Sequence, residues 1–160
     1  MSRLDVVKQC FTVLAERSLA LALPLAMGMV QVDEQLTVAS EIQDSLEDFN
    51  VNLERVDADG ETKLWDACAK GADLLEEYAS ARTAAGHKPP SKRLIVLTDG
   101  ADTESEIKMT TLARRLESME CVVDAVVVGK VVPASKFLLA LAAYCHGAIL
   151  IPPTAEAAMQ

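Results

Sequence analysis

The 160-residue sequence is poor in aromatic residues and has no patterned cysteines. Aromatic residues make up 4% of the chain and hydrophobic residues 51%, so aliphatic side chains must build the core, and disorder is excluded. The four cysteines, Cys10, Cys68, Cys121 and Cys145, include no Cys-x-x-Cys pair, whereas zinc sites need ligands at short offsets. We interpret them as small buried hydrophobes in a reducing compartment.

The chain also lacks a basic surface and a membrane-spanning segment. Its net charge is −9, which excludes nucleic acid as a partner because a phosphate backbone requires a basic stripe. The apolar run over 18–30 is interrupted by Pro24 and is shorter than the roughly 20 residues of a membrane helix. Acidic residues and helical periodicity before it do not fit a signal peptide. We therefore expect a soluble, cytoplasmic protein without a membrane partner.

Catalytic patterns are missing as well. We find no Gly-rich phosphate loop and no Ser-His-Asp arrangement. Cys145 and His146 are adjacent at a helix end, so they point in different directions and do not form a nucleophile–base pair. The segment around Asp99 has some likeness to a phosphatase motif, but Leu97 stands where the nucleophilic aspartate is needed. The sequence predicts that the chain is not an enzyme.

Short runs rich in Val, Ile and Leu alternate with helical patterns along the chain. We predict strands over 25–32, 36–40, 93–98, 121–128 and 148–151, and helices over 3–17, 41–56, 63–82, 104–119, 134–144 and from Thr154. This order predicts one domain over 1–160, of the α/β class, with a doubly wound, mostly parallel sheet and helices on both faces. Strand 36–40 is expected to lie antiparallel at one edge, and Trp65 is interpreted as a core residue.

Candidate ligands follow the predicted strands and turns. Asp99 ends strand 93–98, and Thr62 lies at a junction between a loop and a helix. Ligands of doubly wound sheets bind at the carboxyl ends of strands, and a hydroxyl with a carboxylate suits Mg²⁺ or Mn²⁺. The competing interpretation is local helix capping. We prefer capping for the acidic residues after Asp99, with Asp102 or Thr103 as the cap and Glu104 and Glu106 in the first turn.

The segments resemble, in order, those of a von Willebrand factor type A (VWA) domain. The opening RLDVVKQCFTVLAERS is similar to the first helix of that family, GETKLWDACAKGADLL to its Gly-x-Thr-x-Leu segment, and LIVLTDGADT to its strand ending in Thr-Asp-Gly. The resemblance covers nearly the whole chain and implies a three-layer, Rossmann-like sandwich. It extends to intracellular members associated with ubiquitin-conjugating modules.

The resemblance also implies a metal-ion-dependent adhesion site, in which Mg²⁺ accepts an acidic residue of a protein partner. The matching ligands here are Thr62 and Asp99, although Glu61 stands where family members often have glycine. The family's Asp-x-Ser-x-Ser motif and the strand before it are absent, and helix 3–17 has no strand in front of it. We expect the natural protein to continue upstream of Met1, and the chain as given to bind Mg²⁺ weakly and to expose two inner strand edges.

The sequence thus predicts a non-enzymatic protein-interaction module with a partial Mg²⁺ site. The first alternative is a metal-independent scaffold module, in a protein of the ubiquitin pathway. The second, of another class, is a Mg²⁺-dependent hydrolase of the phosphatase type.

Overall fold

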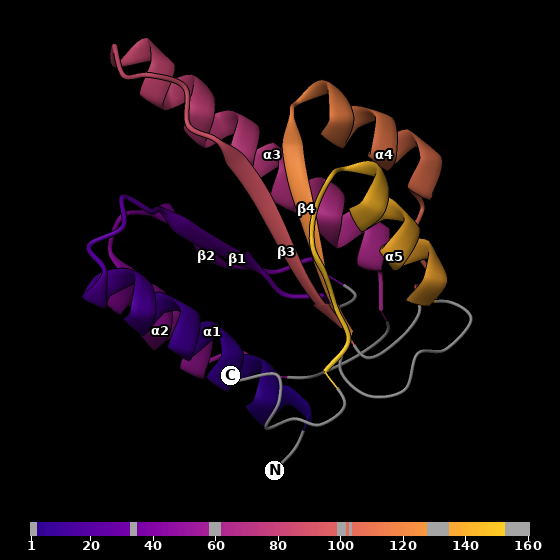
Figure 1. Ribbon diagram of the computed structural model, residues 1–160, viewed down its shortest axis with the longest axis horizontal. Helices are drawn as coiled ribbons and strands as arrows, with labels where there is room; N and C mark the ends of the chain where they lie inside the picture. The colour runs from indigo at the N-terminus through magenta and orange to yellow at the C-terminus, as the bar shows by residue number, and fades with distance from the viewer. Residues whose placement is uncertain are drawn as a thin grey trace.

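The computed structural model describes residues 3–32, 35–57, 62–98, 102, 104–127 and 135–152 (Figure 1). In chain order, the helices and strands are α1 (Arg3–Ala20), β1 (Met27–Val30), β2 (Val38–Gln43), α2 (Leu46–Glu54), α3 (Leu64–Ala84), β3 (Lys92–Thr98), α4 (Met109–Ser118), β4 (Cys121–Val127), α5 (Ser135–Tyr144) and β5 (Ile149–Leu150). The order of strands and helices confirms the predicted α/β class. The helix predicted from Thr154 lies outside the described residues.

The strands form two separate sheets. Strands β3, β4 and β5 pair in parallel, in that order, while β1 and β2 form an antiparallel pair. The antiparallel strand predicted over 36–40 is therefore confirmed as β2. Over the described ranges, β1 pairs with β2 alone and β3 with β4 alone.

Helix α3 connects the two sheets, because it contacts β1 and β2 as well as β3. We call α1, α2, β1 and β2 the N-terminal region, and α3, α4, α5 and β3–β5 the C-terminal region. Figure 1 shows the N-terminal region in indigo and purple beside the C-terminal region in rose, orange and yellow. No helix in the described residues is both long and apolar enough to cross a membrane.

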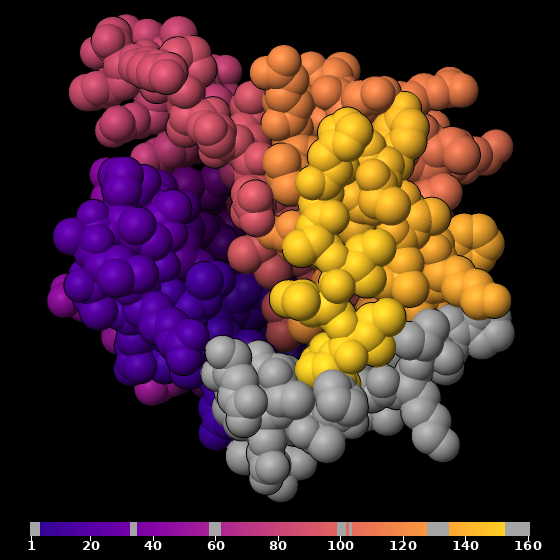
Figure 2. Space-filling model, viewed as in Figure 1, coloured from indigo at the N-terminus to yellow at the C-terminus, as the bar shows by residue number. Residues whose placement is uncertain are grey.

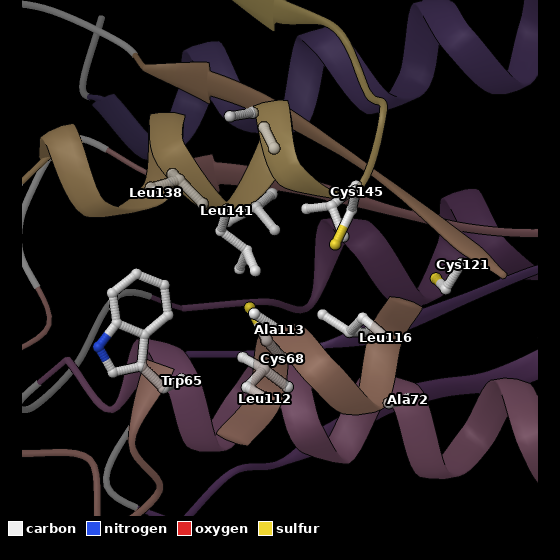
Figure 3. Close-up of a cluster of buried hydrophobic side chains, with 14 of the residues drawn as sticks. Trp65, Cys68, Ala72, Leu112, Ala113, Leu116, Cys121, Leu138, Leu141 and Cys145 are labelled. Carbon is white, nitrogen blue, oxygen red and sulfur yellow. The ribbon is translucent and has the colours of Figure 1, made fainter. Parts of the chain in front are cut away.

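The C-terminal region holds the larger hydrophobic core. Figure 3 shows its side chains converging from three helices, with Trp65 and Cys68 on α3, Leu112 on α4, and Leu138 and Leu141 on α5. Leu138 is fully buried and Trp65 is 8% exposed, which confirms the tryptophan as a core residue. Aliphatic and small side chains make up most of the cluster, as the scarcity of aromatic residues predicts.

The N-terminal region has a much smaller core. Its buried members are Ala15 on α1 and Leu46, Phe49 and Leu53 on α2. The Phe11 ring packs edge-on against Phe49, with 6.4 Å between the ring centroids. This cluster holds α1 and α2 together over one side of the β1–β2 pair.

Helix α2 begins later than the sequence predicted. Strand β2 continues through Gln43, so residues 41–43, which were predicted as the start of a helix over 41–56, lie in a strand, and that boundary is wrong. Ser45 then provides the N-cap, since its side-chain oxygen accepts a hydrogen bond of 3.2 Å from the Asp48 N–H. The cap residue therefore decides the start of the helix.

Strand β4 is tied closely to both of its neighbours. The carboxylate of Asp124 accepts a hydrogen bond of 2.7 Å from the Arg93 guanidinium on β3, and another of 2.7 Å from the Ala148 N–H before β5. Gly147 lies directly against β4, because a Cβ atom there would be 1.7 Å from the Val123 carbonyl oxygen. Glycine is required at this position to let β5 approach β4.

Candidate functional site

Of the two predicted metal ligands, Thr62 and Asp99, only Thr62 is among the described residues. Thr62 is half-buried and lies two residues before α3 begins at Leu64. Asp99 directly follows β3 and lies outside the described residues. The pairing of Thr62 with Asp99 therefore stays a prediction.

The N-terminus of α3 is capped by the segment that follows β3. The Ser105 hydroxyl oxygen accepts hydrogen bonds from the N–H groups of Trp65, at 2.9 Å, and Asp66, at 3.2 Å. Asp102 Oδ1 accepts a further hydrogen bond of 3.3 Å from Trp65 N–H and a short one from the Ser105 hydroxyl. These acceptors satisfy N–H groups that a helix start leaves without partners, and the Asp102 charge favours the positive end of the helix dipole.

Helix α3 in turn supplies hydrogen-bond acceptors to the same segment through Asp66. Its two carboxylate oxygens accept hydrogen bonds from the backbone N–H groups of Glu106, at 3.0 Å, and Ile107, at 2.9 Å. Asp66 is 9% exposed, so both bonds form largely out of water, where losing them is costly. We call Asp66, Asp102 and Ser105 with their backbone partners the reciprocal clasp. It holds Asp102 and Ser105–Ile107 against the start of α3, which lies close in sequence to Thr62.

The predicted local cap of the following helix is wrong. Helix α4 begins at Met109 with Lys108 as its N-cap residue, and no side chain makes a capping hydrogen bond there. Glu104 and Glu106 precede this helix and are not in its first turn. Asp102 does cap a helix, but that helix is α3, which is distant in sequence. Thr103 lies outside the described residues.

The described residues do not form a metal site by themselves. No group of three or more His, Cys, Asp or Glu side chains among them could hold a metal ion. The two carboxylates of the clasp, Asp66 and Asp102, already accept hydrogen bonds from backbone N–H groups.

The cysteines are unsuited to nucleophilic chemistry. Burial raises the pKa of the Cys68 thiol to about 12, helped by the negative charges of Asp102 and Cys121, and burial also raises the pKa of Cys121 to about 11. Cys145 is buried with its pKa raised by burial, whereas the neighbouring His146 is exposed. A thiolate is the reactive form of cysteine, so these thiols stay protonated and inert near neutral pH.

Comparison with known proteins supports the fold. No family model matches the chain. A probable bifunctional E2/E3 enzyme of Acanthamoeba polyphaga mimivirus is 27% identical over 129 residues, covering 81% of this chain; the chain spans only about a tenth of that protein's length.

Three solved structures share the architecture at low sequence identity. An aerotolerance-related membrane protein of Bacteroides fragilis matches with a TM-score of 0.73 and 14% identity, covering 99% of this chain and 85% of the other. The VWA domain of SpRpn10 matches with a TM-score of 0.60 and 14% identity, covering 97% and 77%. Proximal thread matrix protein 1 from the mussel byssus matches with a TM-score of 0.71 and 17% identity, covering 98% and 39%. These likenesses confirm the predicted doubly wound architecture.

Proposed function

We propose that this chain, which has the fold of a von Willebrand factor type A domain, is a non-enzymatic protein-interaction module of an intracellular protein in the ubiquitin pathway. The reciprocal clasp carries this proposal. It holds the first turn of α3 and the segment with Asp102 and Ser105–Ile107 in one fixed arrangement, and a surface that is already fixed binds a partner without a large ordering cost. The E2/E3 name of the mimivirus relative supports the choice of pathway.

The finer part of the proposal is a Mg²⁺ site at this surface. The Thr62 hydroxyl and the Asp99 carboxylate would hold the ion, with water and a partner's acidic side chain as further oxygen ligands. The ion would supply positive charge on an otherwise acidic chain of net charge −9. A carboxylate of the partner protein is the group that such a charge attracts.

Catalysis by the domain itself has little support among its residues. The pKa values of Cys68 and Cys121 are raised to about 12 and 11, which argues against a cysteine nucleophile. Leu97, which is half-buried in β3, occupies the position of the aspartate that a phosphatase-type hydrolase would need. We therefore assign any enzymatic activity of a longer polypeptide to other domains.

The alternative is a metal-independent scaffold of the same fold. It is favoured by the engagement of Asp66 and Asp102 with backbone N–H groups, because this leaves the metal with few carboxylate ligands. On this alternative, the same rigid surface contacts the partner directly.

Calorimetric titration with Mg²⁺ distinguishes the proposed Mg²⁺ site from the metal-independent scaffold. We expect weak binding to the chain, no binding to Asp99→Ala, and reduced binding to Thr62→Ala. Glu47→Ala removes an exposed carboxylate on α2 and should bind as the unchanged chain does. If the unchanged chain gives no binding heat, the metal part of the proposal fails and the scaffold is favoured. Mg²⁺-dependent turnover of a generic phosphomonoester, lost in Asp99→Ala, would overturn the non-enzymatic assignment.

A further inference from the structure

Helices α4 and α5 pack against each other, but their exposed sides differ in chemistry. Both bury aliphatic side chains in the larger core, as Leu112 of α4 and Leu138 of α5 show (Figure 3). The exposed residues of α4 are polar, as expected on a protein surface: Thr110, Thr111, Arg114, Glu117 and Ser118. The exposed residues of α5 are Lys136, Phe137, Ala140, Ala143 and Tyr144. Helix α5 is therefore largely apolar on its outer side as well, which is typical of a helix that is covered on both sides.

The outer side of α5 carries two of the six aromatic residues of the chain. Phe137 is 58% exposed and Tyr144 is 46% exposed, whereas the other four are buried or half-buried. Residues three, four and seven apart lie on one side of a helix, so Phe137, Ala140 and Tyr144 form one stripe. Aromatic residues are enriched among the residues that dominate the energy of protein interfaces. This stripe thus has the composition of an interface centre.

A groove of about 370 Å³ lies between the two helices, along this stripe. Its lining includes Met109, Ala113 and Arg114 of α4 and Ala140, Leu141 and Tyr144 of α5. Both helices lie wholly within the described residues and pack on α3, β4 and β5. In Figure 2, the orange and yellow residues of these helices lie at the surface, on the side away from the N-terminal region. The groove is therefore made without any part of β1, β2 or β3.

The charge at the groove is positive, although the chain is acidic overall. Arg114 and Lys136 are exposed, and within the described ranges neither forms an ion pair, whereas Arg115 pairs with side chains of α3. Glu117, the only acidic residue of the two helices, accepts a hydrogen bond from the Tyr144 hydroxyl. A carboxylate of a partner would therefore meet two cations that have no anionic partner of their own.

We propose that the groove between α4 and α5 binds an amphipathic helix of a partner protein, with an apolar stripe flanked by acidic residues. The stripe would pack on Phe137 and Tyr144, and the acidic residues would pair with Arg114 and Lys136. The partner segment is a helix because the main chains of α4 and α5 are hydrogen-bonded within their own helices. An extended segment would find no main-chain partners there, whereas a helix satisfies its own.

Other occupants fit the charges less well. A second copy of the chain would bring the same two cations to the contact, and its net charge of −9 would repel the first copy. The same net charge would repel an anionic membrane. The groove shares no residue with the reciprocal clasp and does not require Mg²⁺, so the proposal stands apart from the proposed metal site.

The probe is a fluorescent helical peptide with leucines alternately three and four residues apart and glutamates on either side of that stripe. One control peptide has lysine in place of every glutamate, and the other has the same composition in an order without a stripe. Fluorescence anisotropy measures their binding to the full chain. We expect the glutamate peptide to bind at least tenfold more tightly than either control. The net charge of −9 alone would favour the lysine peptide, so this comparison separates the local surface from the overall charge.

Two pairs of variants locate the binding surface. Arg114→Glu should weaken binding of the glutamate peptide at least tenfold, whereas Arg17→Glu makes the same change at an exposed position of α1 and should leave it unchanged. Phe137→Ser should also weaken binding at least tenfold. Its control is Leu21→Ser, since Leu21 is 70% exposed and lies just after α1. Circular dichroism checks that each variant folds, and the comparison of the three peptides on the unchanged chain does not depend on them.

Several results would overturn the proposal. They include equal binding of the three peptides, tighter binding of the lysine peptide, and no binding of any peptide. Dimers of the chain alone that dissociate in Phe137→Ser would identify a second copy as the occupant. Binding to phosphatidylserine vesicles that is lost in the same variant would identify a membrane. Each experiment is done without Mg²⁺, so this proposal and the proposed metal site can fail separately.

Discussion

The N-terminal and C-terminal regions differ in the size of the hydrophobic core that holds their helices and strands together. The C-terminal region surrounds its three strands with side chains from three helices, including the fully buried Leu138 and Leu116. The N-terminal region rests on four buried residues around Phe49 and on the support of α3. Since stability follows the apolar area removed from water, the C-terminal region should fold and persist without the other, whereas the N-terminal region depends on its neighbour.

The largest loss in the free energy of unfolding is expected from Phe49→Ala. Removing an aromatic ring from a small core costs about 4 kcal/mol, and no other large cluster in the N-terminal region compensates for it. We expect hydrogen exchange to accelerate in α1, α2, β1 and β2, while the amides of β3 and β4 stay protected.

Leu138→Ala is the matched control in the larger core. It should cost about 3 kcal/mol and accelerate exchange in both regions, because α3 supports β1 and β2 from the C-terminal region. Uniform acceleration in Phe49→Ala would show one cooperative unit and end the distinction between the regions.

A smaller effect is expected from the reciprocal clasp, which lies entirely in the C-terminal region. Asp66→Ala leaves the N–H groups of Glu106 and Ile107 without acceptors and should lower the free energy of unfolding by about 2 kcal/mol. Asp66→Asn retains one acceptor oxygen and should lose about half as much. Urea denaturation measures both.

Asp73, which is on the same helix as Asp66, serves as the control for the Asp66 variants. It forms an ion pair of 2.7 Å with Arg115, and its side chain is 44% exposed, so Asp73→Ala should cost less than about 1 kcal/mol. An equal loss in Asp66→Ala and Asp73→Ala would show that the clasp is no stronger than a surface ion pair.

An effect that is absent at neutral pH and present only at alkaline pH concerns the cysteines of the two regions. Cys10 is half-buried on α1, where burial raises its pKa, and Cys68 is buried on α3. Alkylation of Cys10 in the folded chain should therefore be slower than that of a free thiol but faster than that of Cys68, which should require unfolding. The pKa of Cys68 is raised from 9.0 to about 12, so the folded state keeps a proton that the unfolded state releases. Stability should therefore fall as the pH rises above 9, by about 1.4 kcal/mol at pH 10.

The Cys68→Ala variant isolates this contribution. Its unfolding free energy, measured with urea at pH 7 and pH 10, should fall less over this range than that of the unchanged chain. An equal fall in both would assign the pH dependence to other groups.

The sequence predicted the elements well where local pattern determines them. The apolar periodicity around Leu64 and Cys68 indicated α3, and the Val-rich run after Cys121 indicated β4; both are confirmed. The start of α4 was predicted wrongly because Asp102 or Thr103, followed by Glu104 and Glu106, looks like a local cap. The acceptors of Asp102 and of the nearby Ser105 are instead used by N–H groups of α3, about forty residues earlier, and no local pattern reveals such a pairing.

The candidate site was predicted only in part, for the same reason. Thr62 lies at the helix start where it was expected, and Asp99 falls outside the described residues, so their joint role stays a prediction. Asp66 was not singled out, since an acidic residue in the first turn of a helix is common and favourable on its own account. A second signal was available: a run of backbone N–H groups at 104–107 without a local helix needs acceptors from elsewhere.

Gly147 limits how the sequence can change. With the Val123 carbonyl oxygen 1.7 Å from where a Cβ atom would be, none of the other amino acids fits without separating β5 from β4. In a library that samples every substitution at every position, position 147 should accept glycine alone, while the neighbouring exposed His146, whose φ is 58°, should accept glycine and asparagine best and β-branched residues worst. This contrast makes the α5–β5 turn a convenient internal standard for any mutational survey of the domain.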